Sequence, residues 1–188
     1  MNEPRPTQER LPIWIAVGGT PQSVVRAGSL GLPLALAIIG GEPASFAPLF
    51  ELYRRAAERA GQDPSRLATS INVHGFVAGT SQEAGDVFYP AQAAVMDRIG
   101  RERGWSPTSR RQYEAGRGPR GAIFAGSPAE VTDKILAAHA VFGFDRFLIQ
   151  MAIGIIDHAT LMRAIELFGT KVAPEVRKAV TTSTAPSA

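Results

Sequence analysis

Predominantly apolar runs alternate with amphipathic segments along this chain. The runs cover residues 12–17, 33–39, 69–78 and 147–151, and they are typical of strands buried inside a sheet. Each run is followed by a segment with apolar residues three and four positions apart, which predicts a helix packed on one face. Repeated strand–helix units predict a parallel sheet with right-handed crossovers. Four units make an α/β half barrel of the (β/α)8 TIM-barrel type, and an open doubly wound sheet is the alternative.

Capping residues and prolines predict where the later helices begin and end. A long helical stretch begins at Ser81, and Pro90 predicts a kink or a break in it. Residues 127–130, Ser-Pro-Ala-Glu, form a capping box that opens another helix. The last predicted helix covers about residues 157–168, and a short one follows Pro174.

Three segments differ in composition from these units. Residues 105–120 are rich in Arg, Gly, Ser and Pro, and they predict a long loop of the kind that often forms a lid or a binding segment. Residues 1–10 predict a flexible N-terminal segment, and residues 181–188 predict a disordered tail. Residues 11–180 are therefore expected to form one structural unit.

Composition narrows the functional class. The 188 residues are 45% apolar and 20% charged, which is ordinary for one soluble domain. The chain has no cysteine, so disulfides, thiolate metal sites and a cysteine nucleophile are excluded, and a reducing cytosol is favoured. The first ten residues lack the pattern of a signal peptide, and no apolar run is long enough to span a bilayer. We therefore expect a cytoplasmic protein with no membrane partner.

Positive charge gathers in one region. The net charge is +3, and the isoelectric point is near 9.7. A solvated loop and helix end is the favoured explanation of the arginine cluster, and a flap that faces an anion comes second. A nucleic-acid surface comes last, because no aromatic residues or reader motif accompany the cluster, so no nucleic-acid partner is expected. The cluster comprises Arg101, Arg103, Arg110, Arg111, Arg117 and Arg120.

The sharpest local motif follows the first strand. Gly18 and Gly19 allow a tight turn, and Thr20 is the predicted N-cap of the next helix. The hydroxyls of Thr20 and Ser23 and the free amides of that helix could hold a phosphate. Plain capping is the alternative, and spacing alone favours it. The pair Gly40-Gly41 ends the second strand at the same edge of the sheet, where a flat ring could rest.

Histidine offers a weak candidate for chemistry. His74, His139 and His158 are not spaced as metal ligands, so no metal site is expected. Strand alternation places His74 on the same face as Asn72, and we expect a core histidine satisfied by hydrogen bonds, with a catalytic or pocket role as the alternative. The chain also lacks the Gly-x-Ser-x-Gly elbow of a serine hydrolase.

Several of these segments, in their order along the chain, resemble the luciferase-like flavin-dependent monooxygenases. The resemblance covers about residues 11–180. It is carried by residues 12–27, residues 31–41, the run Leu-Tyr-Arg-Arg-Ala at 52–56, the run Gly-Ser-Pro-Ala-Glu-Val at 126–131, residues 147–151, and Val-Ala-Pro at 172–174.

The resemblance implies an oxidoreductase that binds reduced FMN and oxidises a small organic substrate with oxygen. A flavin reductase is one candidate source of the reduced cofactor. The segment 105–120 would correspond to the mobile active-site loop of the family. The implied cofactor-binding residues are Gly18, Gly19, Thr20 and Ser23 for the phosphate, Ile39 and Gly40 near the ring, and Arg117 and Arg120 closing over the anion.

Family members are nearly twice as long, and the resemblance covers only the C-terminal half of their barrel. Either a missing N-terminal half or a homo-oligomer would then complete the sheet. Two further functions stay open. One is a truncated, non-catalytic flavin-binding half barrel, and the other is a hydride-transfer enzyme that uses a deazaflavin.

Overall fold

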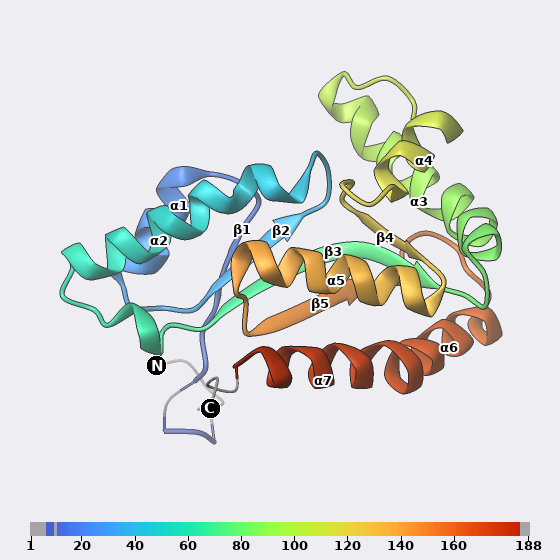
Figure 1. Ribbon diagram of the computed structural model, residues 1–188. Helices are drawn as coiled ribbons and strands as arrows, with labels where there is room; N and C mark the ends of the chain where they lie inside the picture. The colour runs from blue at the N-terminus through green and yellow to red at the C-terminus, as the bar shows by residue number, and fades with distance from the viewer. Residues whose placement is uncertain (1–6, 10, 185–188) are drawn as a thin grey trace.

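A computed structural model describes residues 7–9 and 11–184 of the chain. Its centre is a parallel sheet (Figure 1). Residues 1–6 and 10 of the predicted flexible segment and residues 185–188 of the predicted disordered tail lie outside the described residues, so the predictions for those residues stay untested. The strands are β1 (Ile15–Val17), β2 (Leu34–Ile38), β3 (Thr69–Val77), β4 (Ile123–Gly126) and β5 (Arg146–Gln150).

Strand β3 is the centre of the sheet. β2 pairs with residues 69–73 of β3 and β5 pairs with residues 70–74, so these two strands flank β3 on opposite sides. β1 pairs with β2, and β4 pairs with residues 74–77 of β3. The predicted parallel α/β organisation is confirmed. The number of strands was wrong by one, because β4 is only Ile-Phe-Ala-Gly and is too short to show a pattern.

The helices follow the strands in the predicted alternation, with two differences. α3 runs through Pro90 without a break, because Phe88 and Ala91 on either side are buried and hold the helix in the core. The segment 105–120 is not one long loop, because it contains α4. The helices are α1 (Pro21–Ser29), α2 (Ala47–Arg59), α3 (Ser81–Arg103), α4 (Arg110–Arg117), α5 (Pro128–Phe142), α6 (His158–Leu167) and α7 (Ala173–Thr184).

Helix α4 is stabilised by a local cap and by one buried residue. Ser109 accepts a hydrogen bond from the backbone N–H of Gln112, and the Gln112 side chain accepts one from the backbone N–H of Ser109. This capping box satisfies free backbone donors at the start of the helix. Tyr113 is fully buried and fastens the helix to the core. The polar composition of the segment therefore concealed a short helix with one buried aromatic anchor.

The C-terminal helices are continuous. A π turn, Phe168–Val172, joins α6 to α7, and α7 extends to Thr184. Residues 181–184 of the predicted disordered tail are therefore helical. Among the described residues, no helix is long and apolar enough to cross a membrane.

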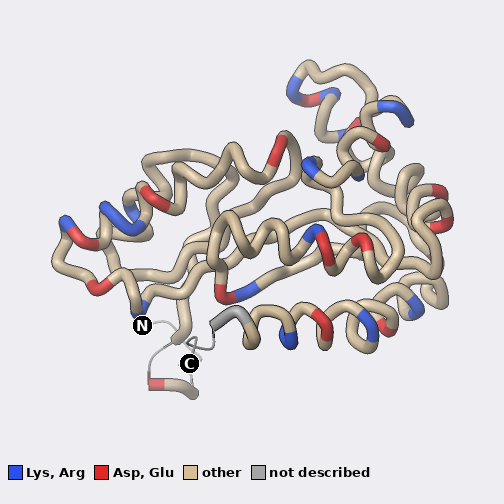
Figure 2. Tube along the Cα trace, in the orientation of Figure 1, with Lys and Arg blue, Asp and Glu red and all other residues tan. Residues whose placement is uncertain are grey.

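The two faces of the sheet differ. Leu34, Leu36 and Ile38 of β2 are fully buried beneath the helices, and the intervening Ala35 and Ala37 on the other face are only half-buried. On the helical side, Phe50 of α2 packs against Phe142 of α5 with ring centroids 5.0 Å apart. We call the two sides the outer face, which the helices cover, and the inner face. Charged residues lie mainly on the helices and loops (Figure 2).

Candidate cofactor site

Two glycine turns meet at the carboxyl edge of the sheet. Because β1 and β2 pair in parallel, the turns Gly18-Gly19 and Gly40-Gly41 emerge side by side. Gly19 (φ 106°) and Gly41 (φ 76°) both have left-handed backbone conformations that favour glycine. An added Cβ would lie 3.7 Å from the Phe46 ring at Gly19 and 4.0 Å from it at Gly41. One aromatic ring therefore separates the two turns.

The start of α1 is open. Thr20 is the N-cap residue, as predicted, but its exposed side chain makes no capping hydrogen bond. Pro21 occupies the first position of the helix, and Ser23 two residues later is half-buried. Elsewhere the cap side chain does accept a backbone N–H, as it does at Thr80, Ser109, Ser127 and Asp157. The Thr20 hydroxyl is therefore available to a ligand, together with the backbone N–H of Gln22. Pro21 has no N–H, and the N–H groups of Ser23 and Val24 donate to the backbone oxygen of Thr20.

His74 lies on the inner face, one residue beyond the last β3 position that pairs with β2. Its sheet neighbours are Ile123 of β4 and Gln150 of β5. The exposed fraction of Ile39 is 43%, and that of His74 is 9%. The buried Nδ1 of His74 has no hydrogen-bond partner among the described residues. Burial lowers the pKa of His74, which favours a neutral imidazole at pH 7.

The prediction for His74 was therefore partly wrong. The residue is buried, as expected of a core histidine, but its ring is not fully satisfied by hydrogen bonds. Gln150 pairs with His74 in the register of β3 and β5, and it is exposed. Sequence reasoning did not single out Gln150, although alternation along residues 147–151 could have placed it on this face.

We call the part of the sheet edge that carries the two glycine turns the glycine edge. Arg120 lies next to it, although it comes from a distant part of the sequence. Its Nη2 lies 2.7 Å from Oε1 of Glu42, the residue that follows the second glycine turn. An open cleft of about 520 Å³ lies between this turn and residues 115–121. The Arg120 side chain is 83% exposed, so it is free to exchange the Glu42 carboxylate for another anion.

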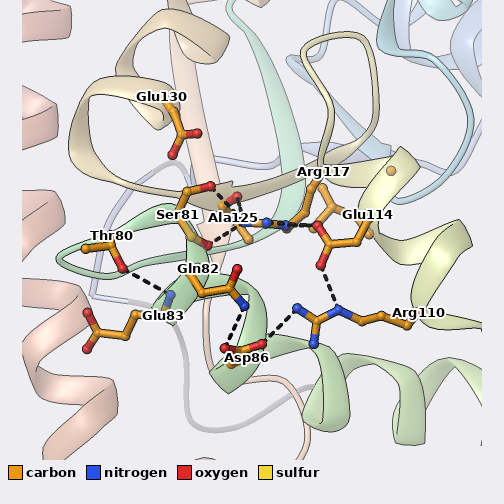
Figure 3. A network of polar contacts seen from close by, with 12 residues as sticks. Thr80, Ser81, Gln82, Glu83, Asp86, Arg110, Glu114, Arg117, Ala125 and Glu130 are labelled. Carbon is orange, nitrogen blue, oxygen red and sulfur yellow. Dashed lines mark hydrogen bonds and ion pairs between the residues drawn. The ribbon is translucent and has the colours of Figure 1, made fainter.

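Arg117 has a different environment from Arg120. Its Nη1 donates to the backbone oxygen of Ser81 at 2.7 Å and to that of Ala125 at 3.3 Å. Its Nε and Nη2 both contact Glu114, and the side chain is only 13% exposed (Figure 3). All three guanidinium nitrogens therefore have partners within the chain. Arg117 fastens α4 to the start of α3 and to β4.

Lys134 completes this attachment of α4. Its Nζ donates to the backbone oxygens of Gly118 at 2.8 Å, Ile123 at 2.7 Å and Arg117 at 3.1 Å. Burial, with a smaller contribution from Arg117, lowers the pKa of Lys134 to about 8. The ammonium group caps the carboxyl end of α4, where carbonyls lack helical partners. Its position within an ordinary amphipathic helix gave no sequence signal for this role.

The predicted site residues thus fall into two groups. The structure brings together Gly18, Gly19, Thr20, Gly40 and the Arg120–Glu42 pair at one edge. Ile39 follows β2 there, and His74 lies on β3 between Ile123 and Gln150. Arg117 is tied to α3 and β4 instead. Among the described residues, no group of three or more His, Asp or Glu side chains is placed to hold a metal ion.

Comparison with solved structures supports the half barrel. The monooxygenase RslO1 from Streptomyces bottropensis is 24% identical, with a TM-score of 0.71 over 92% of this chain and 50% of its own. The oxygenating constituent of 3,6-diketocamphane monooxygenase from Pseudomonas putida, solved with FMN, is 21% identical, with a TM-score of 0.59 over 87% of this chain and 48% of its own. An F420-dependent secondary alcohol dehydrogenase, solved with an F420–acetone adduct, is 13% identical, with a TM-score of 0.64 over 90% and 50% of the two chains.

The present chain spans about half the length of each of these solved structures. The prediction of a half barrel of parallel βα units is thereby confirmed. No curated protein matches the chain. The family model of the luciferase-like monooxygenases matches residues 1–146, which is more than half of the sequence. The chain belongs to the luciferase-like monooxygenase family.

Proposed function

We propose that this chain binds FMN at the glycine edge and forms the cofactor-holding part of a flavin-dependent monooxygenase that acts on a small organic substrate. The observation that carries the proposal is the open start of α1, where the exposed Thr20 hydroxyl leaves the helix uncapped beside two glycine turns. Family membership supports a flavin-type cofactor.

The phosphate of FMN is the group that this edge suits best. The backbone N–H of Gln22 has no partner within the described residues, and the partial positive charge at this end of α1 favours an anion. The hydroxyls of Thr20 and Ser23 add donors one helical turn apart, and Gly18 and Gly19 leave no side chain to obstruct close approach. Arg120 supplies a charged partner from across the cleft if it releases Glu42.

The ring of the cofactor would lie toward the inner face. Ile39 offers an exposed aliphatic surface at the end of β2, and His74 on β3 offers a buried nitrogen without a partner among the described residues. A neutral imidazole can donate or accept one hydrogen bond to a polar edge of a ring, depending on its tautomer. When bound, reduced flavin supplies the electrons for oxygen activation, and the protein contributes binding, orientation and exclusion of water.

Titration with FMN and with riboflavin tests the phosphate site, because riboflavin has the ring but lacks the phosphate. We expect Thr20→Val to weaken FMN binding about 10-fold, equivalent to about 1.4 kcal/mol, and to leave riboflavin binding unchanged. Thr132→Val, on the half-buried side of α5, is the matched control and should change neither affinity. Arg120→Met should weaken FMN binding and also leave riboflavin binding unchanged.

Four other outcomes count against parts of the proposal. Failure to bind FMN would refute the site, and an equal loss of riboflavin affinity in Thr20→Val would refute its assignment to the phosphate. Tighter binding of F420 than of FMN in a parallel titration would favour deazaflavin-dependent hydride transfer. FMN binding without oxygen-dependent turnover, in the presence of a flavin reductase, would favour a non-catalytic half barrel.

A further inference from the structure

The inner face of the sheet is open on β1, β2 and β5, whereas Ser70 and His74 of β3 between them are buried. Ala16 of β1 is exposed and Ala35 and Ala37 of β2 are half-buried. On β5, the large side chains on the inner face are also exposed, and Leu148 retains 48% of its accessible surface. Apolar side chains exposed together on one face are typical of a surface that another chain covers.

The two edges of the sheet are open as well. In the described part of the chain, β1 pairs only with β2, and β5 pairs only with β3. Each strand therefore presents a row of backbone donors and acceptors on its free side. Such edges are competent to pair with a strand of another chain.

The inner face is concave. β1 and β5 are separated by β2 and β3 in the sheet, yet the guanidinium carbon of Arg146 lies 4.8 Å from the ring centroid of Trp14. Side chains from opposite edges can meet in this way only when the sheet curls around them. The contact also gives the Arg146 charge a favourable partner within its own chain.

Side-chain size changes systematically across this concave face. The residues on β1 and β2 are alanines at positions 16, 35 and 37. Those on β5 are long, and they are Arg146, Leu148 and Gln150. A barrel interior packs well when large and small side chains alternate. If the β5 edge of one copy lies next to the β1 edge of another, the long side chains of β5 border the alanines of β1 and β2.

We propose that two copies of this chain close head to tail into one eight-stranded parallel barrel. The β5 edge of each copy pairs with the β1 edge of the other, around a twofold axis parallel to the strands, so every strand keeps the same direction. At the level where β1, β2, β3 and β5 lie together, each copy supplies four strands, and two copies supply the eight of a (β/α)8 barrel. Leu148 then fills the space over Ala16 and Ala37 of the second copy.

Sedimentation velocity over a range of concentrations tests this assembly. We expect a dimer, and we expect Leu148→Glu to yield a monomer, because a carboxylate would be buried against the alanines of the second copy. The far-UV circular dichroism of Leu148→Glu should match that of the parent chain. The matched control is Leu30→Glu, at a leucine of similar exposure (55% against 48%) beyond the end of α1, and it should remain dimeric.

Cross-linking tests which edges meet. Because the chain has no cysteine, variants Ala16→Cys and Leu148→Cys each carry a single thiol. A short bismaleimide should join the two variants, once mixed, into a two-chain species. A parallel mixture of Leu30→Cys and Leu148→Cys should give little product.

Three results would overturn the proposal. They are a cooperative monomer at all concentrations, a dimer that survives Leu148→Glu, and an open ladder of higher oligomers. None of these results depends on flavin binding, so the assembly and the cofactor site are tested separately.

Discussion

Two regions at the carboxyl edge of the same sheet differ in whether their polar groups have partners within the chain. At the ends of β1 and β2, the Thr20 hydroxyl and the first turn of α1 have no capping contact. At the end of β4, the charged groups of Arg117 and Lys134 have partners at every nitrogen. The first region contains the candidate cofactor site, and the second is a fixed structural attachment.

The difference shows that charge density alone is a poor indicator of a ligand site. The arginine-rich segment was the most strongly charged part of the sequence, yet Arg110 pairs with Asp86 and Glu114, and Arg117 pairs with Glu114. The glycine turn carries no charge, but its donors are available. A ligand binds where the chain leaves donors without partners.

Removing Arg117 should have the largest effect on stability. We expect Arg117→Met to lower the free energy of unfolding by about 3 kcal/mol, because it leaves Glu114 and the carbonyls of Ser81 and Ala125 without their buried partner. Urea unfolding measures this change. Arg111→Met, at an exposed position of the same helix, is the control and should change the free energy by less than about 0.5 kcal/mol.

The same variant also tests the role of Arg117 in binding. If Arg117 belongs only to the structural region, FMN affinity measured on the folded variant should stay close to that of the parent chain. A selective loss of FMN affinity without loss of stability would place Arg117 in the cofactor site and would remove the contrast between the two regions.

Sequence reasoning could recover the fold because strands and helices leave periodic patterns. Strands β1, β2, β3 and β5 and the glycine turns at 18–19 and 40–41 were predictable from apolar runs and from the glycine pairs that follow them. β4 and α4 were not, because the apolar run around β4 covers only residues 122–125 and α4 depends on tertiary contacts. Tyr113 is the residue that anchors α4, and a single buried aromatic has no periodicity to detect.

The candidate site was predictable only in part, for a related reason. Local motifs identify a residue that could bind a ligand, but they do not reveal which partners the fold supplies. Arg117 and Arg120 are three residues apart and look equivalent in the sequence. The fold buries Arg117 against Ser81 and leaves Arg120 exposed beside Glu42, and neither partner is near in sequence.

A change at the glycine turn should have an intermediate effect. We expect Gly19→Ala to lower the free energy of unfolding by about 1–2 kcal/mol, because its φ of 106° is strained for an L-residue, although the added Cβ meets no clash. Gly18→Ala is the matched control, since a Cβ there meets nothing within 4 Å. Thermal unfolding of the two variants checks the difference.

The two glycine variants also distinguish the effect of backbone strain on stability from the effect of an added side chain on FMN binding. Gly18→Ala should preserve stability and still weaken FMN binding if the cofactor phosphate lies against this backbone. Unchanged FMN affinity in Gly18→Ala would mean that the ligand does not contact the turn closely, and the open region would then lack its proposed occupant.

The smallest expected effect is a dependence of stability on pH that originates at His74. Burial lowers the pKa of His74 below its ordinary 6.5, so the unfolded chain binds a proton more readily than the folded chain as the pH falls below that value. The contribution of His74 is therefore fully favourable above pH 6.5 and is lost as the pH falls toward the folded pKa. The free energy of unfolding in urea should differ less between pH 7.5 and about pH 5.5 for His74→Leu than for the parent chain.

The control is His158→Leu, at an exposed histidine at the start of α6. It should show the same difference in the free energy of unfolding as the parent chain. Equal pH dependence in all three proteins would show that the imidazole gains a partner on protonation, and His74 would then belong with the satisfied groups of the structural region rather than with the open edge.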